Sequence, residues 1–108
     1  MIKKTSKTDI SSLAEIDRLV HEPARLMVMS LLYVVDSADF TFLVNHTGLT
    51  WGNLSVHISK LEDAGYLVVE KVIKGKRPNT TLKLTSQGRH AFRDYARRIK
   101  QVFQDFDD

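Results

Sequence analysis

The chain has 108 residues, of which 43% are hydrophobic and 27% charged, and a net charge of +3. This length and composition suffice for one small domain with a modest core and exclude two full domains. The absence of cysteine excludes disulfides, thiolate zinc sites and cysteine nucleophiles. No apolar run approaches the roughly 20 residues of a membrane span, and the N-terminus lacks a secretion signal, so we expect a cytoplasmic protein without membrane contact.

The charge is distributed unevenly along the chain. Residues 1–70 carry a net charge of −3, whereas residues 71–100 carry +9 from ten basic side chains and one acidic one. A concentrated basic region attracts polyphosphate backbones and steers their approach. We therefore favour nucleic-acid contact for the basic cluster of residues 71–77, while the arginines after Gly88 fit a solvated helix face equally well.

The N-terminal part predicts an arm and a short helix. Residues 1–10 are polar, show little periodicity and are expected to form a flexible arm, which leaves residues 11–108 as a single domain. The short helix is capped by Ser11 or Ser12. Three apolar residues share one face of it, namely Leu13, Ile16 and Val20.

The next helix is predicted over residues 24–35. Pro23 suits its first turn, where the missing amide proton has no partner to lose. The run is apolar nearly all round, which indicates a helix buried on more than one side at the centre of the core. We interpret its residues Met27, Met29 and Tyr33 as core filling; contact with an unknown small-molecule effector is the alternative.

Two helices joined by a tight turn follow. A short helix around Leu43 is predicted to end at Gly48, and Thr50 is a good N-cap for a helix over residues 51–64. Trp51, the first residue of that helix, is expected in the core. One apolar stripe runs along the helix and consists of Leu54, Ile58 and Leu61. This arrangement is the layout of a helix-turn-helix.

The apolar period then changes from helical to two. Residues 66–73 and 80–85 are predicted strands, and the linker 74–79 is a glycine and proline turn with three cations. Together these segments predict a β-hairpin. Ser86 is expected to cap a long final helix that ends near Phe106.

Three segments within this order of elements resemble one family. They are Glu22-Pro23-Ala24-Arg25, the run LSVHISKLEDAGYL from Leu54 to Leu67, and Leu84-Thr85-Ser86-Gln87-Gly88-Arg89. On these residues the chain resembles winged helix-turn-helix transcriptional regulators and is similar to the small MarR/ArsR-like members. The resemblance implies a mainly α fold with a small β-hairpin (α+β), a long C-terminal dimerisation helix and binding to double-stranded DNA. It does not extend to thiolate metal sensing, because the cysteines are missing, and the chain is shorter than typical MarR proteins.

A recognition helix buries one stripe and presents the opposite one to base edges in the major groove. With the apolar stripe buried, a rotation of about 100° per residue places a second set on the far face. This set consists of Gly52, Asn53, Val56, Ser59 and Lys60. Asn53 can bond bidentately to adenine, Lys60 can reach guanine or phosphate, and Val56 can contact a thymine methyl group.

Thr50 and His57 complete the predicted recognition-helix set. Thr50 caps the helix, and it can also hold a phosphate at the helix N-terminus. His57 lies on the flank and is interpreted as a polar or phosphate contact, because His21, His46 and His90 show no metal-ligand spacing. We therefore predict neither a metal nor a cofactor.

The hairpin is predicted to contact the minor groove or flanking phosphates. Its candidate residues are Lys74, Lys76, Arg77 and Asn79. Arg77 is the best candidate for insertion into the groove. The alternative is that these cations serve only solubility and prevent strand pairing.

The last helix carries an apolar seam with a coiled-coil-like spacing. The seam consists of Phe92, Tyr95, Ile99, Val102 and Phe106, with Phe103 widening it. Because so small a domain cannot cover the whole helix, we expect a homodimer, with the early helix alongside. The alternative is a seam that folds back on its own core.

The sequence thus predicts a homodimeric, sequence-specific DNA-binding regulator. We expect a repressor, because repression is the usual mode of the proteins that it resembles. No nucleophile elbow, phosphate loop or carboxylate pair indicates an enzyme. Two alternatives are left open. A winged-helix protein-interaction module would bind nucleic acid with weak salt dependence, and a nonspecific nucleic-acid binder would show steep salt dependence without sequence preference.

Overall fold

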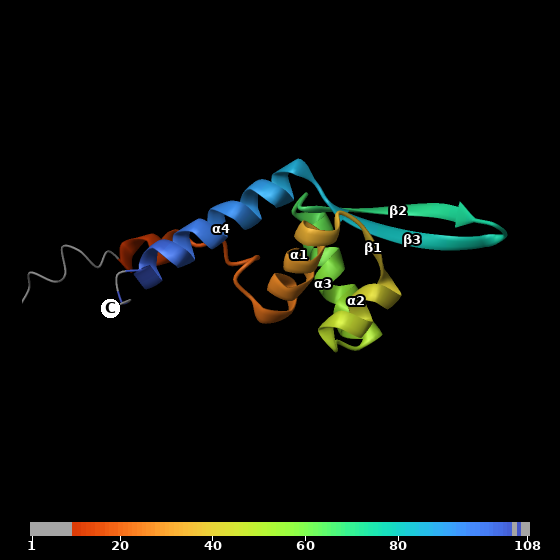
Figure 1. Cartoon of the computed structure of the whole chain (residues 1–108), viewed down its shortest axis with the longest axis horizontal. Coiled ribbons are helices and arrows are strands. Elements are labelled where there is room, and N and C mark those ends of the chain that lie inside the picture. Colours follow the sequence, from red (N-terminus) through yellow and green to blue (C-terminus); the bar gives the residue numbers. More distant parts are fainter. Residues whose placement is uncertain (1–9, 105, 107–108) are drawn as a thin grey trace, which may run out of the picture.

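The computed structural model describes residues 10–104 and Phe106. Its elements are the 3-10 helix η2 (Ile10–Glu15), the helices α1 (Pro23–Val35), α2 (Phe40–Thr47), α3 (Trp51–Asp63) and α4 (Ser86–Gln104), and the strands β1 (Ala38–Asp39), β2 (Leu67–Lys74) and β3 (Arg77–Leu84). Helices α1 to α3 form a compact body, from which α4 and the β2–β3 hairpin extend in opposite directions (Figure 1). The predicted α+β class, mainly helical with a small hairpin and a long C-terminal helix, is confirmed.

The sheet is antiparallel, with the strand order β1-β3-β2. The hairpin is tighter than predicted, because pairing continues to Lys74 opposite Arg77 and leaves only Gly75 and Lys76 in the turn. Gly75 has a φ of 64°, which a two-residue hairpin turn requires and glycine adopts at no steric cost. The predicted linker 74–79 is therefore wrong, since most of it belongs to the two strands.

Strand β1 lies in a segment for which the sequence predicted only a polar break. Ala38 pairs with Leu82 and Asp39 pairs with Thr81, so β1 covers only the part of β3 near the helices. Asp39 then caps α2, because its carboxylate accepts a hydrogen bond from the Phe42 amide at 2.8 Å.

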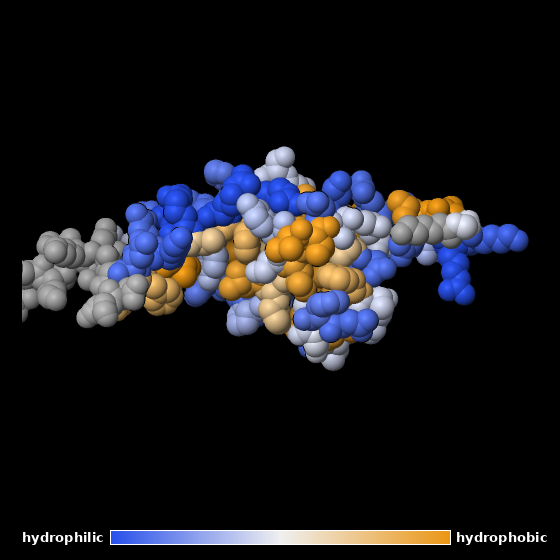
Figure 2. All heavy atoms as spheres, in the orientation of Figure 1, coloured by the Kyte–Doolittle hydropathy of each residue, from blue (hydrophilic) through white to orange (hydrophobic). Residues whose placement is uncertain are grey.

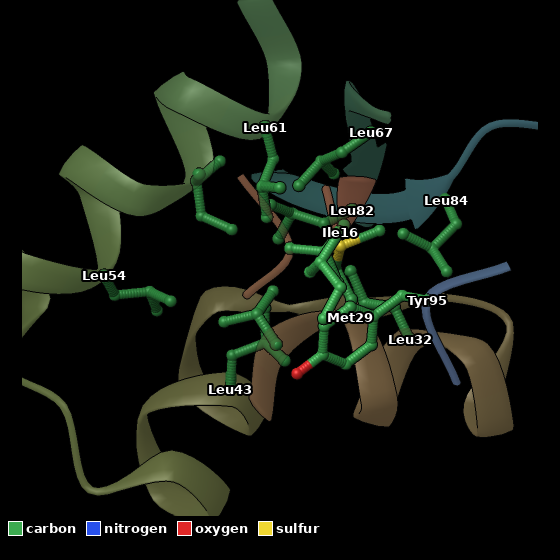
Figure 3. Packing of buried hydrophobic residues seen from close by; sticks show 13 residues of the cluster. Ile16, Met29, Leu32, Leu43, Leu54, Leu61, Leu67, Leu82, Leu84 and Tyr95 are labelled. Atoms are coloured by element: carbon green, nitrogen blue, oxygen red, sulfur yellow. The ribbon is translucent and has the colours of Figure 1, made fainter. Parts of the chain in front are cut away.

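The core lies where α1, α2, α3 and the inner half of the sheet meet. Figure 3 shows its side chains converging from these elements and from α4. The largest fully buried side chains are Met29, Leu32, Leu43, Leu54, Leu61, Leu82, Val20 and Val28. The predicted stripe of α3 is thereby confirmed as buried, as is Met29 as core filling.

Helix α1 is buried on one side only. Val28 and Leu32 face the core, whereas Met27 is 39% exposed and Val34 is 78% exposed. The prediction of a helix buried on more than one side is therefore wrong for its outer face, and so is the interpretation of Met27 as core filling. Glu22 caps the helix, and its carboxylate accepts a hydrogen bond from the Arg25 amide at 2.8 Å.

The predicted first helix is only the short η2, which begins at Ile10 and ends before Ile16. The rest of the predicted arm, residues 1–9, lies outside the described residues. Asp17 follows η2 and accepts hydrogen bonds from the Leu19 amide and the Tyr66 hydroxyl. Burial and this bond to the Asp17 carboxylate raise the pKa of Tyr66 to about 12.

Helix α4 is capped by Thr85. The predicted cap, Ser86, is instead the first residue of the helix. The Thr85 hydroxyl accepts a hydrogen bond from the Gly88 amide at 3.0 Å and donates one to the Gly65 carbonyl at 2.6 Å. One side chain thus fixes the start of α4 to the end of α3. No helix within residues 10–104 combines the length and apolarity needed to cross a bilayer.

Candidate nucleic-acid interface

The side of α3 opposite its buried stripe is open to solvent. Its N-terminus is fixed by Thr50, whose hydroxyl accepts a hydrogen bond from the Asn53 amide at 3.1 Å. The residues that the sequence placed on this side are all exposed, namely Gly52, Asn53, Val56, Ser59 and Lys60. We call these five residues the outer face of α3. Its amide, hydroxyl, ammonium and methyl groups are those with which proteins read base edges.

Two further exposed residues on α3 were missed by the sequence analysis. Trp51 is 55% exposed and stacks on Phe40, with ring centroids 5.7 Å apart, so its assignment to the core is wrong. It stands at the first residue of α3, where the neighbouring α2 covers only one face of the ring. Ser55 is exposed as well and extends the polar surface of the helix.

His57 belongs to a small polar cluster that joins α3 to the start of α1. Its Nδ1 atom lies 3.1 Å from Nη1 of Arg25 and 3.9 Å from the Glu22 carboxylate. A guanidinium can only donate, so this contact requires the lone pair on Nδ1 and leaves the proton on Nε2. The structure thus places His57 at the edge of the outer face, where its ring is half-buried and is held by the contact with Arg25.

Arg25 is the buried member of that cluster. Only 9% of the residue is exposed, and its Nε donates to the Leu19 carbonyl at 2.6 Å. The hydrogen bond from the Arg25 amide, together with the nearby charge of the Arg25 guanidinium, lowers the pKa of Glu22. No pattern in the sequence indicates this role of Arg25, since only the crossing of α1 and α3 brings it to His57.

The hairpin presents cations at its far end. Lys76 and Arg77 are exposed, and neither has an ion pair with any residue that the structure describes. Asn79 is half-buried within β3, and Lys74 ends β2. Figure 2 shows hydrophilic side chains at this tip and a second hydrophilic stretch along α4.

Most arginines of α4 are paired within the chain. Arg89 contacts Asp36 at 2.9 Å, and Arg98 contacts both Asp94 at 2.9 Å and Glu15 at 3.2 Å. The bond from Arg98 lowers the pKa of Asp94. These contacts join α4 to α1 and η2, so for Arg89 and Arg98 an intramolecular role accounts for the charge.

The seam of α4 is covered over part of its length. Tyr95 and Val102 are buried within the chain, and the Tyr95 hydroxyl lies 2.7 Å from Nδ1 of His21. Phe92 and Ile99 are half-buried. Phe103 is 63% exposed and Phe106 is 60% exposed. Helix η2 packs beside this end of α4 (Figure 1).

Two open depressions adjoin the residues considered for an effector. The first lies beside Tyr33 and is lined also by His90, Phe92, Arg93, Asp94, Ala96 and Arg97. The second lies beside Met27, between α1 and α2. Within the described part of the chain, no group of three acidic or histidine side chains is placed to hold a metal ion.

Residues 24–103 match the family model of the winged helix DNA-binding domain. The chain is 37% identical over 86 residues to an uncharacterized protein of Methanocaldococcus jannaschii. The aligned region covers 79% of this chain and 92% of that protein. It is 32% identical to a transcriptional regulator homologue from Pyrococcus horikoshii OT3, with a TM-score of 0.83 over 89% of this chain and 97% of the other. A MarR-family regulator from Enterococcus faecalis V583 shares the fold, with a TM-score of 0.72, 18% identity and coverage of 91% and 87%.

The chain therefore belongs to the winged helix DNA-binding family, and transcriptional regulators, one of them of the MarR family, share its fold. In this fold, α2 and α3 form the helix-turn-helix and the β2–β3 hairpin is the wing. The resemblance inferred from the sequence is confirmed.

Proposed function

We propose that this protein is a cytoplasmic, homodimeric regulator of transcription that binds a specific double-stranded DNA sequence. The outer face of α3 enters the major groove, and the wing contacts the backbone or the minor groove. The observation that carries the proposal is the division of α3 into a fully buried apolar stripe and an outer face without a covering element. Base readout requires a helix whose buried side is fixed rigidly in the core and whose exposed side is polar.

Three residues of the outer face have a defined partner in this proposal. Asn53 pairs with adenine, Lys60 with guanine or a phosphate, and Val56 with a thymine methyl group. His57 donates from Nε2 to a phosphate, because Arg25 occupies Nδ1. Lys76 and Arg77 neutralise phosphates beside the groove, since no carboxylate in the described structure pairs with them.

Selection of bound duplexes from a randomised pool, at near-physiological salt, tests the proposal. We expect an inverted repeat with half-sites about 34–36 Å apart, one helical turn, because a twofold dimer places two recognition helices on one face of the duplex. Repression then follows if that repeat overlaps a promoter. Enrichment of no sequence would contradict specific readout by α3, and enrichment of a single half-site would contradict the dimer.

The exposed end of α4 supports the dimer. Phe103 and Phe106, with the exposed Ile10 and Leu13 of η2, leave an apolar surface that no other residue described by the structure covers. A second copy would bury this surface through a twofold contact. The depression beside Tyr33 is our candidate site for a small-molecule effector.

Phe103→Glu is expected to convert the dimer to a monomer, because it places a charge in an apolar contact. Sedimentation should show the mass halved while the helical circular dichroism stays unchanged. Lys100→Glu, one turn earlier and also exposed, is the matched control and should stay dimeric. A Phe103→Glu protein with wild-type mass would place the interface elsewhere.

A further inference from the structure

The outer half of the wing stands free of the rest of the molecule. Strand β1 pairs with β3 only at Leu82 and Thr81, so residues 77–80 of β3 pair with β2 alone. Four residues of strand span about 13 Å. Figure 1 shows this two-stranded ribbon projecting away from the helices. At its end Arg77 and Pro78 are exposed, so residues near the tip are free to contact another molecule.

The tip of this ribbon carries an apolar pair. Ile73 lies opposite Pro78, so both side chains are on the same face of the ribbon, one residue pair before the turn. Ile73 is 77% exposed and Pro78 is exposed as well. The apolar side chains nearer the body, Leu82 and Leu84, are buried instead. Because a free ribbon has no core to fill, packing within the chain does not account for Ile73.

Cations surround the apolar pair. Lys76 forms the turn, Arg77 follows it, and Lys71 precedes Ile73 by two residues on the same strand face; all three are exposed. Figure 2 shows hydrophobic and strongly hydrophilic surface side by side at this tip. A protein partner would need acidic groups around an apolar centre. Duplex DNA offers both at every step, with phosphates outside and stacked apolar base faces within.

The whole β2–β3 hairpin, of which this ribbon is the outer half, also has the length to reach a second groove. An eight-residue strand such as β2 spans about 26 Å. Half a helical turn of DNA, which separates neighbouring major and minor grooves on one face, is about 17 Å. With α3 in the major groove, the tip can therefore reach the adjacent minor groove.

We propose that Ile73 and Pro78 form an apolar wedge that inserts between base pairs in the minor groove, so that this protein kinks the DNA to which it binds. The inference rests on the proposed DNA binding. Apolar side chains inserted at a base step unstack it and bend the duplex by about 20–90° toward the major groove. Lys71, Lys76 and Arg77 hold the phosphates on either side of the kink. The bend makes flexible pyrimidine–purine steps the preferred sites of insertion.

The test uses the full chain and the duplex obtained by selection. Dyes at the two duplex ends report the bend through energy transfer, and anisotropy of the same duplex reports binding. Ile73→Ala should bind with an unchanged salt slope but lose most of the bend, and Ile73→Leu should keep it. Lys76→Ala is the matched control; it should lower the salt slope by about one unit and keep the bend in the saturated complex.

Three results would overturn the proposal: a straight duplex in the saturated wild-type complex, a full bend with Ile73→Ala, or loss of the dimer with Ile73→Ala. The last would mean that the tip contacts a second copy of the chain. Failure of DNA binding itself is separate, because it appears as unchanged anisotropy. Thermal unfolding followed by circular dichroism checks that the variants fold, which we expect since Ile73 contacts no core residue.

Discussion

Gly88→Ala is expected to lower the free energy of unfolding by about 3 kcal/mol. A Cβ at residue 88 would lie 2.0 Å from the Tyr66 carbonyl oxygen, so α4 would have to move away from the end of α3. That movement also strains the hydrogen bond of 3.0 Å from the Thr85 amide to the same carbonyl. Urea unfolding followed by circular dichroism measures the loss as a lower midpoint.

Gly52→Ala is the matched control for this prediction. It is also a helical glycine, but a Cβ there meets no atom within 4 Å. We expect it to raise stability by roughly 0.5–1 kcal/mol, because alanine favours the helix. Its added methyl group faces the proposed DNA surface, so binding should weaken while stability rises. Equal midpoints for the two variants would contradict the close contact of Gly88.

The double variant Asn53→Ala/Lys60→Ala is expected to bind the selected duplex about 100-fold more weakly. Asn53 loses a bidentate contact to a base, and Lys60 loses a contact to guanine or phosphate. For a scrambled duplex the loss should be much smaller, because only Lys60 can contribute there. Fluorescence anisotropy with both duplexes gives the two ratios.

Stability provides the check on the double variant. Both side chains are exposed, so the unfolding midpoint should stay within error of the wild type. Lys100→Ala, which removes a cation from α4, should weaken binding to both duplexes equally and slightly. If Asn53→Ala/Lys60→Ala also weakened both duplexes by the same factor, α3 would contribute charge but no sequence readout.

The helices and their buried stripes were predictable because their signals are local. The spacing of Leu54, Ile58 and Leu61 determines which side of α3 faces the core, whatever covers it. Thr50 and Gly48 likewise mark helix ends by their own chemistry. Trp51 was misassigned because its environment depends on how α2 meets α3, which periodicity does not encode.

The hairpin was predicted, but its register was not. Pro78 suggested a loop, since proline lacks the amide that a strand needs; in the structure it stands near the end of the two-stranded ribbon, where an unpaired amide position is tolerated. Gly75 makes so tight a turn possible that Arg77 and Asn79 belong to β3 and pair with Lys74 and Val72 of β2. β1 was missed because two residues are too few to show an alternating pattern.

The candidate site was also predictable only in the part that depends on local patterns. The outer face of α3 follows from helical geometry once one stripe is buried. The contact of Arg25 with His57 joins residues 32 positions apart and depends on the crossing of α1 and α3, so no local pattern indicates it. Two partners of the α4 arginines, Asp36 for Arg89 and Glu15 for Arg98, are also distant along the chain, which is why a solvated face and a DNA-binding face fitted the sequence equally well.

An amide NMR titration of the whole protein with the selected duplex measures which surface binds DNA. We expect the shift changes to concentrate at residues 50–60 and at the wing, residues 71–79, and to be small along the buried side of α1. Shift changes confined to α4, or to the depression beside Met27, with residues 50–60 unaffected, would contradict DNA recognition by the outer face of α3.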